Sequence, residues 1–184
     1  MPRLFVGLEL PEEAANLLSG LRWGLPGARW ADPSDYHLTL RFIGDIDRRA
    51  AREIEEELSE IDRQALRISI VGLGVFGGDK PHTVYASIAP NRALIELQAE
   101  SERCLRRLGL KPEGRKFTPH ITLARLRSAS VLDVADYLAA NAPFPQCHFT
   151  ADRFALFSAR ESFGGGPYIV EAAYPLQEAV VPLA

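Results

Sequence analysis

The stretch Lys116–Arg127, KFTPHITLARLR, decides the fold of this chain. Its apolar residues are typical of a β-strand, and no helical period fits them. Side chains two positions apart in a strand point to the same face, so His120 and Thr122 are expected to stand together. The sequence therefore predicts an imidazole and a hydroxyl that project into one space.

The same pattern occurs a second time, in Tyr36–Phe42, YHLTLRF, where His37 and Thr39 are again two positions apart. A single strand histidine is more often a structural residue than a catalytic one. Two copies of His-aliphatic-Thr-Leu, one in each half of the chain, reverse that expectation. We therefore expect both segments to contribute to one site.

Four segments carry a resemblance to a known family, in the family's order and over nearly the whole chain. They are Arg3–Pro11 (RLFVGLELP), Tyr36–Gly44 (YHLTLRFIG), Phe117–Arg125 (FTPHITLAR) and Ser158, which precedes a glycine-rich turn. The chain resembles the 2H phosphoesterases, named for two such histidines, and most closely the RNA 2′,3′-cyclic phosphodiesterases, also called the 2′-5′ RNA ligase family. The resemblance implies a bilobal, pseudo-symmetric α+β fold of residues 1–184. Two antiparallel sheets would line a central cleft, with helices outside and one histidine strand from each lobe facing the other.

Periodicity and turn residues predict the element order βαβαββαβαββ. The expected strands cover 4–10, 36–43, 66–76, 83–89, the second histidine segment, 149–157 and 168–174, with a glycine-rich hairpin loop at 161–166. The expected helices are 11–23, one capped by Asp47, one from Asn91 to Gly109, and 131–140. The run GLGVFGGDK lacks the Gly-Lys-Ser/Thr ending of a phosphate-binding loop, so its glycines are interpreted as strand-end and turn residues.

Composition and charge limit the functional class. The 184 residues are 47% hydrophobic and 24% charged with a formal net charge of −3, which argues against a protein that coats nucleic acid. The segment 111–127 nevertheless carries five basic residues against one glutamate, enough to attract the end of an RNA. There is no membrane-spanning run or export signal, so we expect a cytoplasmic protein with Cys104 and Cys147 as free thiols. We also expect a monomer.

The histidine pairs suit phosphodiester hydrolysis. A 2′,3′-cyclic phosphate needs a base to deprotonate water, an acid to protonate the departing ribose oxygen, and stabilisation of the developing charge. Imidazole serves either proton role near neutral pH, and two opposed histidines, His37 and His120, fit in-line displacement. Thr39 and Thr122 would donate hydrogen bonds to the non-bridging oxygens, so neither a metal nor another cofactor is required. By resemblance, the product is a 2′-phosphate, with His37 as the acid and His120 as the base.

The remaining substrate contacts are less defined by the sequence. Arg125 does not share a face with Thr122 in a regular strand, but it matches the family's Thr-Leu-Ala-Arg and is the first candidate for phosphate contact. Arg41 shares the face of Thr39 if that strand is regular, although a solvated arginine explains it equally well. Phe117 and Tyr168 are candidates to stack on a base or ribose, with core packing as the alternative.

Several alternatives stay open at this stage. The same site could ligate RNA ends through a 2′-5′ bond, or the chain could be a nucleotide-binding module without turnover. A zinc site on the two histidines lacks nearby cysteine or carboxylate ligands at suitable spacing. His82 stands after Pro81 where the family commonly has arginine, and it is interpreted as a surface turn residue. His148 lacks the repeated pattern and is interpreted as structural.

Overall fold

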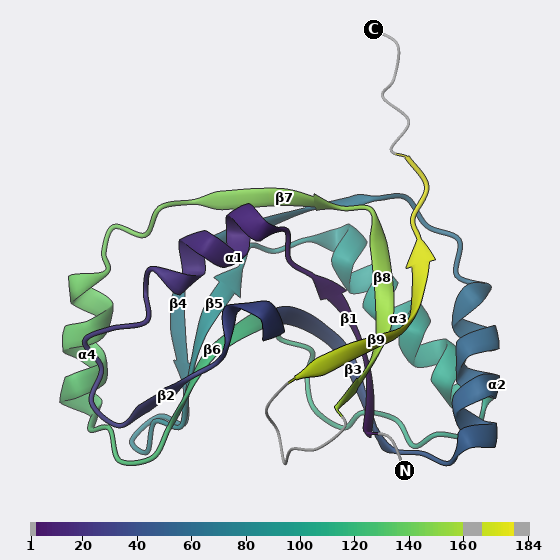
Figure 1. The fold of residues 1–184 in the computed structure, drawn as a ribbon, viewed down its shortest axis with the longest axis horizontal. Helices are drawn as coiled ribbons and strands as arrows, with labels where there is room; N and C mark the ends of the chain where they lie inside the picture. Colours follow the sequence, from purple (N-terminus) through teal and green to yellow (C-terminus); the bar gives the residue numbers. More distant parts are fainter. Residues whose placement is uncertain (1–2, 160–166, 179–184) are drawn as a thin grey trace, which may run out of the picture.

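A computed structural model of the protein describes residues 3–159 and 167–178 (Figure 1). These residues form four α-helices and nine strands, with one short 3₁₀ helix, η1. The strands are β1 (Arg3–Glu9), β2 (Ala28–Trp30), β3 (His37–Asp45), β4 (Leu66–Phe76), β5 (Thr83–Ile88), β6 (His120–Leu126), β7 (Cys147–Ala151), β8 (Arg153–Ala159) and β9 (Tyr168–Pro175). The helices are α1 (Glu12–Ser19), η1 (Pro33–Asp35), α2 (Arg48–Ser59), α3 (Arg92–Arg107) and α4 (Val131–Ala140).

The strands form an antiparallel sheet in the order β7-β4-β5-β6-β3-β1-β8-β9, and β2 adds to β6. The two halves of this sheet, β7-β4-β5-β6 and β3-β1-β8-β9, meet where Leu38 of β3 pairs with Ile121 of β6. The predicted α+β fold is confirmed. The structure refines one expectation, because the two histidine strands are neighbours that join the halves into one continuous sheet.

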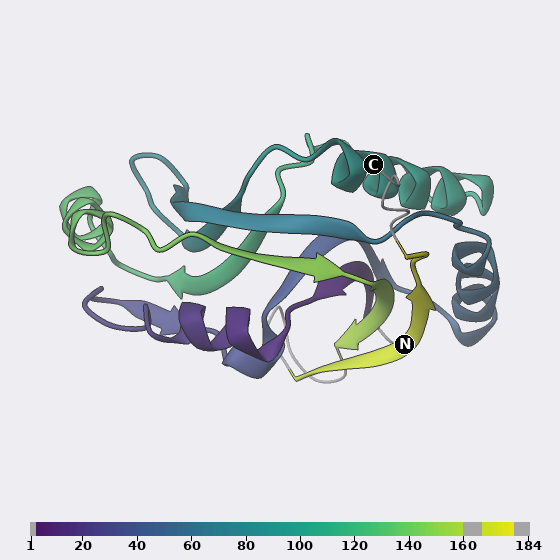
Figure 2. The same ribbon diagram turned by 90° about the horizontal axis from the view of Figure 1, so that it is seen from above.

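The helices cover the two halves separately. In Figure 1, α1 and α4 lie beside the β7-β4-β5-β6 half, whereas α2 and α3 lie beside the β3-β1-β8-β9 half. The view from above places α1 and α3 on opposite sides of the molecule (Figure 2). A continuous hydrophobic core includes residues of both halves, among them Leu38 and Ile121, which are fully buried. The two halves of the sheet thus share one core, and the extent of the domain, residues 1–184, stays a prediction.

Side-chain caps fix the helix starts that the sequence predicts. Asp47 accepts hydrogen bonds from the first-turn amides of α2, and Asn91 accepts one from the amide of Leu94 in α3. Ser130 and Asp133 form a reciprocal capping box at the start of α4. These caps satisfy amides that have no partner inside the helix, which is why short polar residues mark the boundaries.

Three expectations about the elements need correction. The predicted strand 149–157 is two strands, because the chain turns at Asp152 and β7 and β8 lie in different halves of the sheet. The first helix ends at Ser19, short of the predicted 23, and β2 was not predicted at all. The predicted loop at 161–166 lies outside the described residues.

Candidate active site

The junction between the sheet halves brings the two His-x-Thr pairs together. Because Leu38 pairs with Ile121 in an antiparallel register, the flanking positions put His37 opposite Thr122, and Thr39 opposite His120. All four of these side chains lie on the face opposite to Leu38 and Ile121, since neighbouring residues in a strand alternate. Each histidine is therefore diagonal to the other, with a threonine hydroxyl across from it.

Both imidazoles are held in the same way. The Nδ1 atom of His37 is 2.8 Å from the carbonyl oxygen of Asp35, and the Nδ1 atom of His120 is 2.6 Å from that of Thr118. A carbonyl oxygen only accepts hydrogen bonds, so Nδ1 must carry a proton in both rings. The neutral form of each histidine then has its lone pair on Nε2, and the protonated form has its exchangeable proton there. Each half of the fold thus fixes one imidazole for proton transfer through Nε2.

Aromatic side chains surround the two rings. The ring of His37 lies 4.6 Å from that of Phe5 and 4.8 Å from that of Tyr168. The ring of His120 lies 4.9 Å from that of Phe76 and 5.4 Å from that of Tyr85. Such rings restrict each imidazole to one orientation and displace water from its faces.

Burial lowers the pKa of both histidines, since it disfavours the charged imidazolium. The carbonyl hydrogen bond opposes this effect in each case and favours the protonated ring. Nearby positive charge adds to the lowering: His120 acts on the pKa of His37, and Arg125 acts on that of His120.

A β-bulge brings Arg125 onto the histidine face. Across from β6, Val84 pairs with Ala124 and Tyr85 pairs with Thr122, so Leu123 is an extra residue. Leu123 and Ala124 are both buried in the core, and the next residue, Arg125, returns to the face of Thr122. Its Nη1 atom donates a hydrogen bond to the Thr83 hydroxyl at 2.9 Å. Arg125 is exposed on the same face as the histidine pair, and its contact with phosphate stays a prediction.

The equivalent bulge in β3 removes Arg41 from that face. Val6 pairs with Arg41 and Gly7 pairs with Thr39, which leaves Leu40 as the extra residue. Leu40 and Arg41 therefore both point toward the helices, and Arg41 is only 8% exposed. The expectation that Arg41 faces the substrate is wrong, because the strand is not regular at this point.

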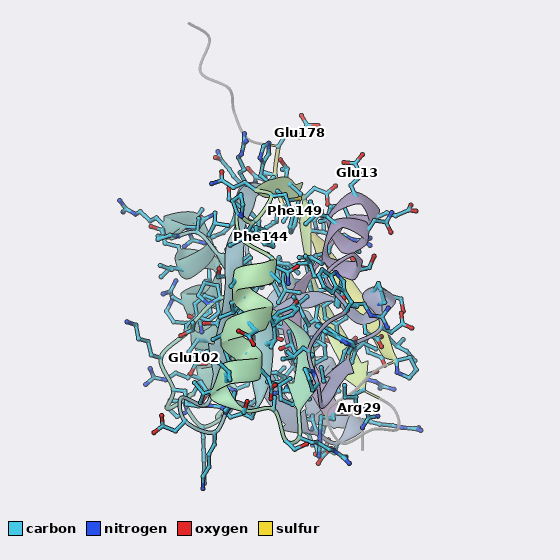
Figure 3. The ribbon with its side chains drawn as sticks, turned by 90° about the vertical axis from the view of Figure 1, so that its left-hand side faces the viewer. Glu13, Arg29, Glu102, Phe144, Phe149 and Glu178 are labelled. Atoms are coloured by element: carbon cyan, nitrogen blue, oxygen red, sulfur yellow. The ribbon has the colours of Figure 1, made fainter. Side chains whose placement is uncertain are left out.

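Arg41 is instead fully engaged on the helix side of the sheet. Its guanidinium forms an ion pair with Glu102 of α3 and donates to the carbonyl oxygens of Phe42 and Lys111. Figure 3 shows Glu102 on the side of the molecule away from Arg29, which lies on β2. Arg41 therefore ties α3 and the segment after it to β3.

The two candidate stacking residues have different surroundings. Tyr168 packs on a small hydrophobic cluster of Phe5, Ala155 and Phe157, separate from the main core, and its ring meets His37 edge-on. Phe117 is partly buried and packs against the main core. The structure thus places Tyr168 at the site and gives Phe117 a packing role.

An open pocket of 380 Å³ adjoins His37. Its apolar wall includes Phe157, Tyr168 and Val170, and its polar wall includes Glu9 and Asp35. Among the described residues, the lining consists of Glu9, Leu10, Glu12, Ala15, Asn16, Pro33, Ser34, Asp35, Tyr36, His37, Phe157, Tyr168 and Val170. Acidic and aromatic walls suit a neutral ring with hydrogen-bond donors and disfavour a phosphate group.

Two glycines permit the close packing around the histidines. A Cβ atom on Gly7 would lie 2.8 Å from the carbonyl oxygen of Leu38, beside the first histidine. A Cβ atom on Gly74 would lie 2.4 Å from the ring of Tyr85, which covers this glycine and contacts His120. The sequence analysis did not predict the packing role of these glycines or the aromatic side chains that contact the two histidines. The alternating residues around Phe5 and Phe76 indicate strands, but alternation alone does not reveal which face of a strand holds the site.

His82 and the two cysteines agree with their interpretations, and the interpretation of His148 as structural stays a prediction. His82 is exposed at the turn before β5, where its Nδ1 atom lies 2.9 Å from the Thr83 hydroxyl. His148 is exposed on β7. Cys104 and Cys147 are both free.

Within residues 3–159 and 167–178, no three His, Cys, Asp or Glu side chains are grouped to hold a metal ion. None of the helices described is long and apolar enough to cross a membrane.

The fold and the paired histidine strands define the class, that of the 2H phosphoesterases. A family model described as the 2′-5′ RNA ligase superfamily matches residues 10–162, and the chain belongs to this family. An Aeropyrum pernix protein named RNA 2′,3′-cyclic phosphodiesterase is 37% identical over 108 residues, which are 58% of this chain and 61% of that protein. A Bacillus subtilis protein of the same name is 30% identical over 164 residues, 85% of this chain and 87% of that protein.

A solved structure has the same fold. Escherichia coli LigT complexed with 3′-AMP superposes with a TM-score of 0.78 and covers 97% of this chain and 100% of its own. The two sequences are 23% identical, so this likeness concerns the fold alone.

Proposed function

We propose that this protein hydrolyses the terminal 2′,3′-cyclic phosphate of RNA to a 2′-phosphate by acid–base catalysis with two histidines and without a metal ion. The single observation that carries this proposal is the matched orientation of His37 and His120, each with Nδ1 on a backbone carbonyl and with no hydrogen-bond partner for Nε2 among the described residues. Two relatives are named RNA 2′,3′-cyclic phosphodiesterase, which supports the substrate class.

The reaction follows from this geometry as two proton transfers. Nε2 of His120 accepts a proton from water as the water oxygen attacks phosphorus. The P–O3′ bond breaks, and Nε2 of His37 donates its proton to O3′. The products are a 2′-phosphate and a free 3′-hydroxyl, and the two histidines have exchanged protonation states, which solvent then resets. Each proton role contributes roughly 10²–10⁴-fold to the rate.

Neutral and cationic donors stabilise the charge that develops on the phosphate. Thr39 and Thr122 hold hydroxyl groups on the histidine face, and Arg125 adds a guanidinium that binds phosphate oxygens in a fork geometry. These donors act where negative charge increases in the transition state, which is the role that a metal ion has in many other phosphoesterases.

The pocket beside His37 holds the nucleoside in this proposal. Tyr168 and Phe157 offer aromatic and apolar surface to the ribose or base, and the carboxylates accept hydrogen bonds from base N–H groups. The binding of 3′-AMP by E. coli LigT supports a nucleotide as the ligand class.

We further propose a monomeric, cytoplasmic enzyme. The two free cysteines suit a reducing compartment. Size-exclusion chromatography with light scattering tests the oligomeric state: a mass near 20.3 kDa supports the monomer, and twice that mass contradicts it.

The test of the function uses the purified protein, a nucleoside 2′,3′-cyclic phosphate and excess EDTA. Chromatography and ³¹P NMR identify the product isomer. Turnover to the 2′-phosphate in EDTA supports the proposal. No turnover in EDTA with recovery on adding zinc or manganese contradicts metal independence, and a 3′-phosphate product reverses the assignment of acid and base.

A further inference from the structure

Two arginines face each other on adjacent strands next to the histidine site. Arg29 of β2 is the direct cross-strand partner of Arg125 of β6. Residues directly opposite in an antiparallel pair project to the same face of the sheet. Arg29 therefore stands on the same face as Arg125, Thr122 and His120, and both arginines are exposed.

The backbone hydrogen bonds fix the spacing of this pair. Antiparallel strands alternate between wide and narrow pairs, and the bonded pairs are two residues apart. The flanking bonds run from the amide of Ala31 to the carbonyl of Leu123 and from the amide of Arg127 to the carbonyl of Gly27. Arg29 and Arg125 therefore occupy a hydrogen-bonded pair, with Cα atoms about 5.5 Å apart. Both side chains therefore start from neighbouring positions on one face of the sheet, and each is long enough to reach an anion bound above that face.

The described residues place no carboxylate against these two charges. Among the residues that the structure describes, no Asp or Glu oxygen pairs with Arg29 or Arg125, and the hydroxyl of Thr83 is the partner of Arg125. Glu102 lies on the other side of the molecule from Arg29 (Figure 3), and its carboxylate pairs with Arg41. Like charges directly opposite each other in a sheet repel and destabilise it, so a bound anion would offset the repulsion between these two arginines.

We propose that Arg29 and Arg125 bind a second phosphate group, the one attached to the 5′ oxygen of the terminal nucleoside. The inference rests on the proposed function. A cyclic phosphate occupies both the 2′ and 3′ oxygens, so an RNA chain that ends in it continues only from the 5′ oxygen. The substrate class is thereby narrowed to RNA ends with at least one phosphate on the 5′ side.

The position of the pair fits a neighbouring phosphate. Since Leu123 is the extra residue of the bulge, Arg125 stands two strand steps from Thr122, roughly 7 Å along β6. This distance is comparable to the separation of successive phosphates in an RNA strand. Arg125 has five N–H donors, so it can serve the reacting phosphate and share the second phosphate with Arg29. Arg29 contacts only the second phosphate and not the reacting one.

The experiment compares Arg29→Ala with wild type on three substrates. They are a nucleoside 2′,3′-cyclic phosphate with a 5′-hydroxyl, the same compound with a 5′-phosphate, and a dinucleotide that ends in a cyclic phosphate. We expect KM for the dinucleotide to rise about tenfold, as for the loss of one charge-assisted contact, and KM for the 5′-hydroxyl compound to change less than twofold. The 5′-phosphate compound shows whether a phosphomonoester suffices or a phosphodiester is needed, and a rise with either phosphate supports the site.

A salt titration gives a second readout. The slope of log kcat/KM against log salt for the dinucleotide should become shallower by about 0.7 in Arg29→Ala, since one phosphate contact to a single strand is lost. The matched control is Arg67→Ala, because Arg67 is also an exposed strand arginine, on β4, and its side chain has no partner among the described residues. Arg67→Ala should change neither KM nor slope. The stability of Arg29→Ala should not fall, because the substitution separates no ion pair.

Two outcomes overturn the proposal: an equal rise in KM for all three substrates, or no rise for any of them. If wild type hydrolyses none of the three, the proposed function fails and the site is tested by binding. Equilibrium affinity is then measured for a dinucleotide and a nucleoside that both end in a stable 3′-phosphate. Weaker binding of the dinucleotide alone by Arg29→Ala supports the site, and equal binding by both proteins contradicts it.

Discussion

Replacing Arg41 by methionine tests the placement of this arginine on the helix side of the sheet. Methionine has a similar length but neither the charge nor the donors. The substitution removes the ion pair to Glu102 and two hydrogen bonds to carbonyl oxygens, all at a side chain that is 8% exposed. It leaves the Glu102 carboxylate with the backbone amide of Glu113 as its partner among the described residues.

The expected cost follows from these contacts. Removing one partner of a buried ion pair costs about 3–5 kcal/mol. The Glu102 side chain is 18% exposed, so water stabilises the orphaned carboxylate to some extent, and we expect the free energy of unfolding to fall by about 2–4 kcal/mol. Because Arg41 does not face the histidines, kcat/KM of the folded variant should stay within about threefold of wild type.

Urea denaturation and steady-state kinetics on the same preparations measure both quantities. Arg41→Met/Glu102→Leu is the matched control, since replacing both partners by apolar groups should recover much of the lost stability. A variant Arg41→Met that unfolds like wild type but loses activity a hundredfold or more would refute the placement. That result would show that Arg41 faces the substrate.

Three further predictions concern the site. Arg125→Met should lower kcat/KM by about 10²-fold or more, because the proposed contact with the phosphate is lost. Its free energy of unfolding should stay within about 0.5 kcal/mol of wild type, because the side chain is exposed. An unchanged kcat/KM would exclude Arg125 from the site. The pH profile of kcat/KM should be a bell, because the base must be neutral, above its pKa, and the acid must be protonated, below its pKa. Since burial lowers the pKa of both histidines, the maximum should lie below the ordinary histidine pKa of about 6.5. A maximum above pH 7 would contradict this direction, and Arg125→Met should raise the pKa of His120 and move the corresponding limb to higher pH. A substrate analogue with a good leaving group at the 3′ position should rescue His37→Ala but not His120→Ala; rescue of His120→Ala instead would exchange the two roles, and rescue of neither would show that acid catalysis does not limit the rate.

Repeated local patterns made the class of fold and the centre of the site predictable. The two His-x-Thr segments are strands because their alternating apolar residues need a buried face, and this alternation sets the direction of both histidines. The N-caps Asp47 and Asn91 were predictable for the same reason, since each satisfies amides within its own first turn.

Features that depend on pairing between distant strands were not predictable. The two bulges are set by the register of β3 against β1 and of β6 against β5, and they move Arg41 away from the histidine face and Arg125 onto it. In regular strands Arg41 would lie on the histidine face and Arg125 on the other face, which is the reverse of what the structure shows. The Arg29–Arg125 pair has the same origin, because β2 is a strand of three residues with too little pattern to predict.

The cyclic phosphate turnover of His37→Ala, His120→Ala and the double variant, in EDTA and beside wild type, tests the central claim most directly. The claim predicts that each single variant loses roughly 10²–10⁴-fold in kcat/KM while remaining folded, and that the double variant loses far less than the product of the two losses, because the histidines act as a unit on one phosphate. If either single variant stays within a few-fold of wild type, the two-histidine account is contradicted.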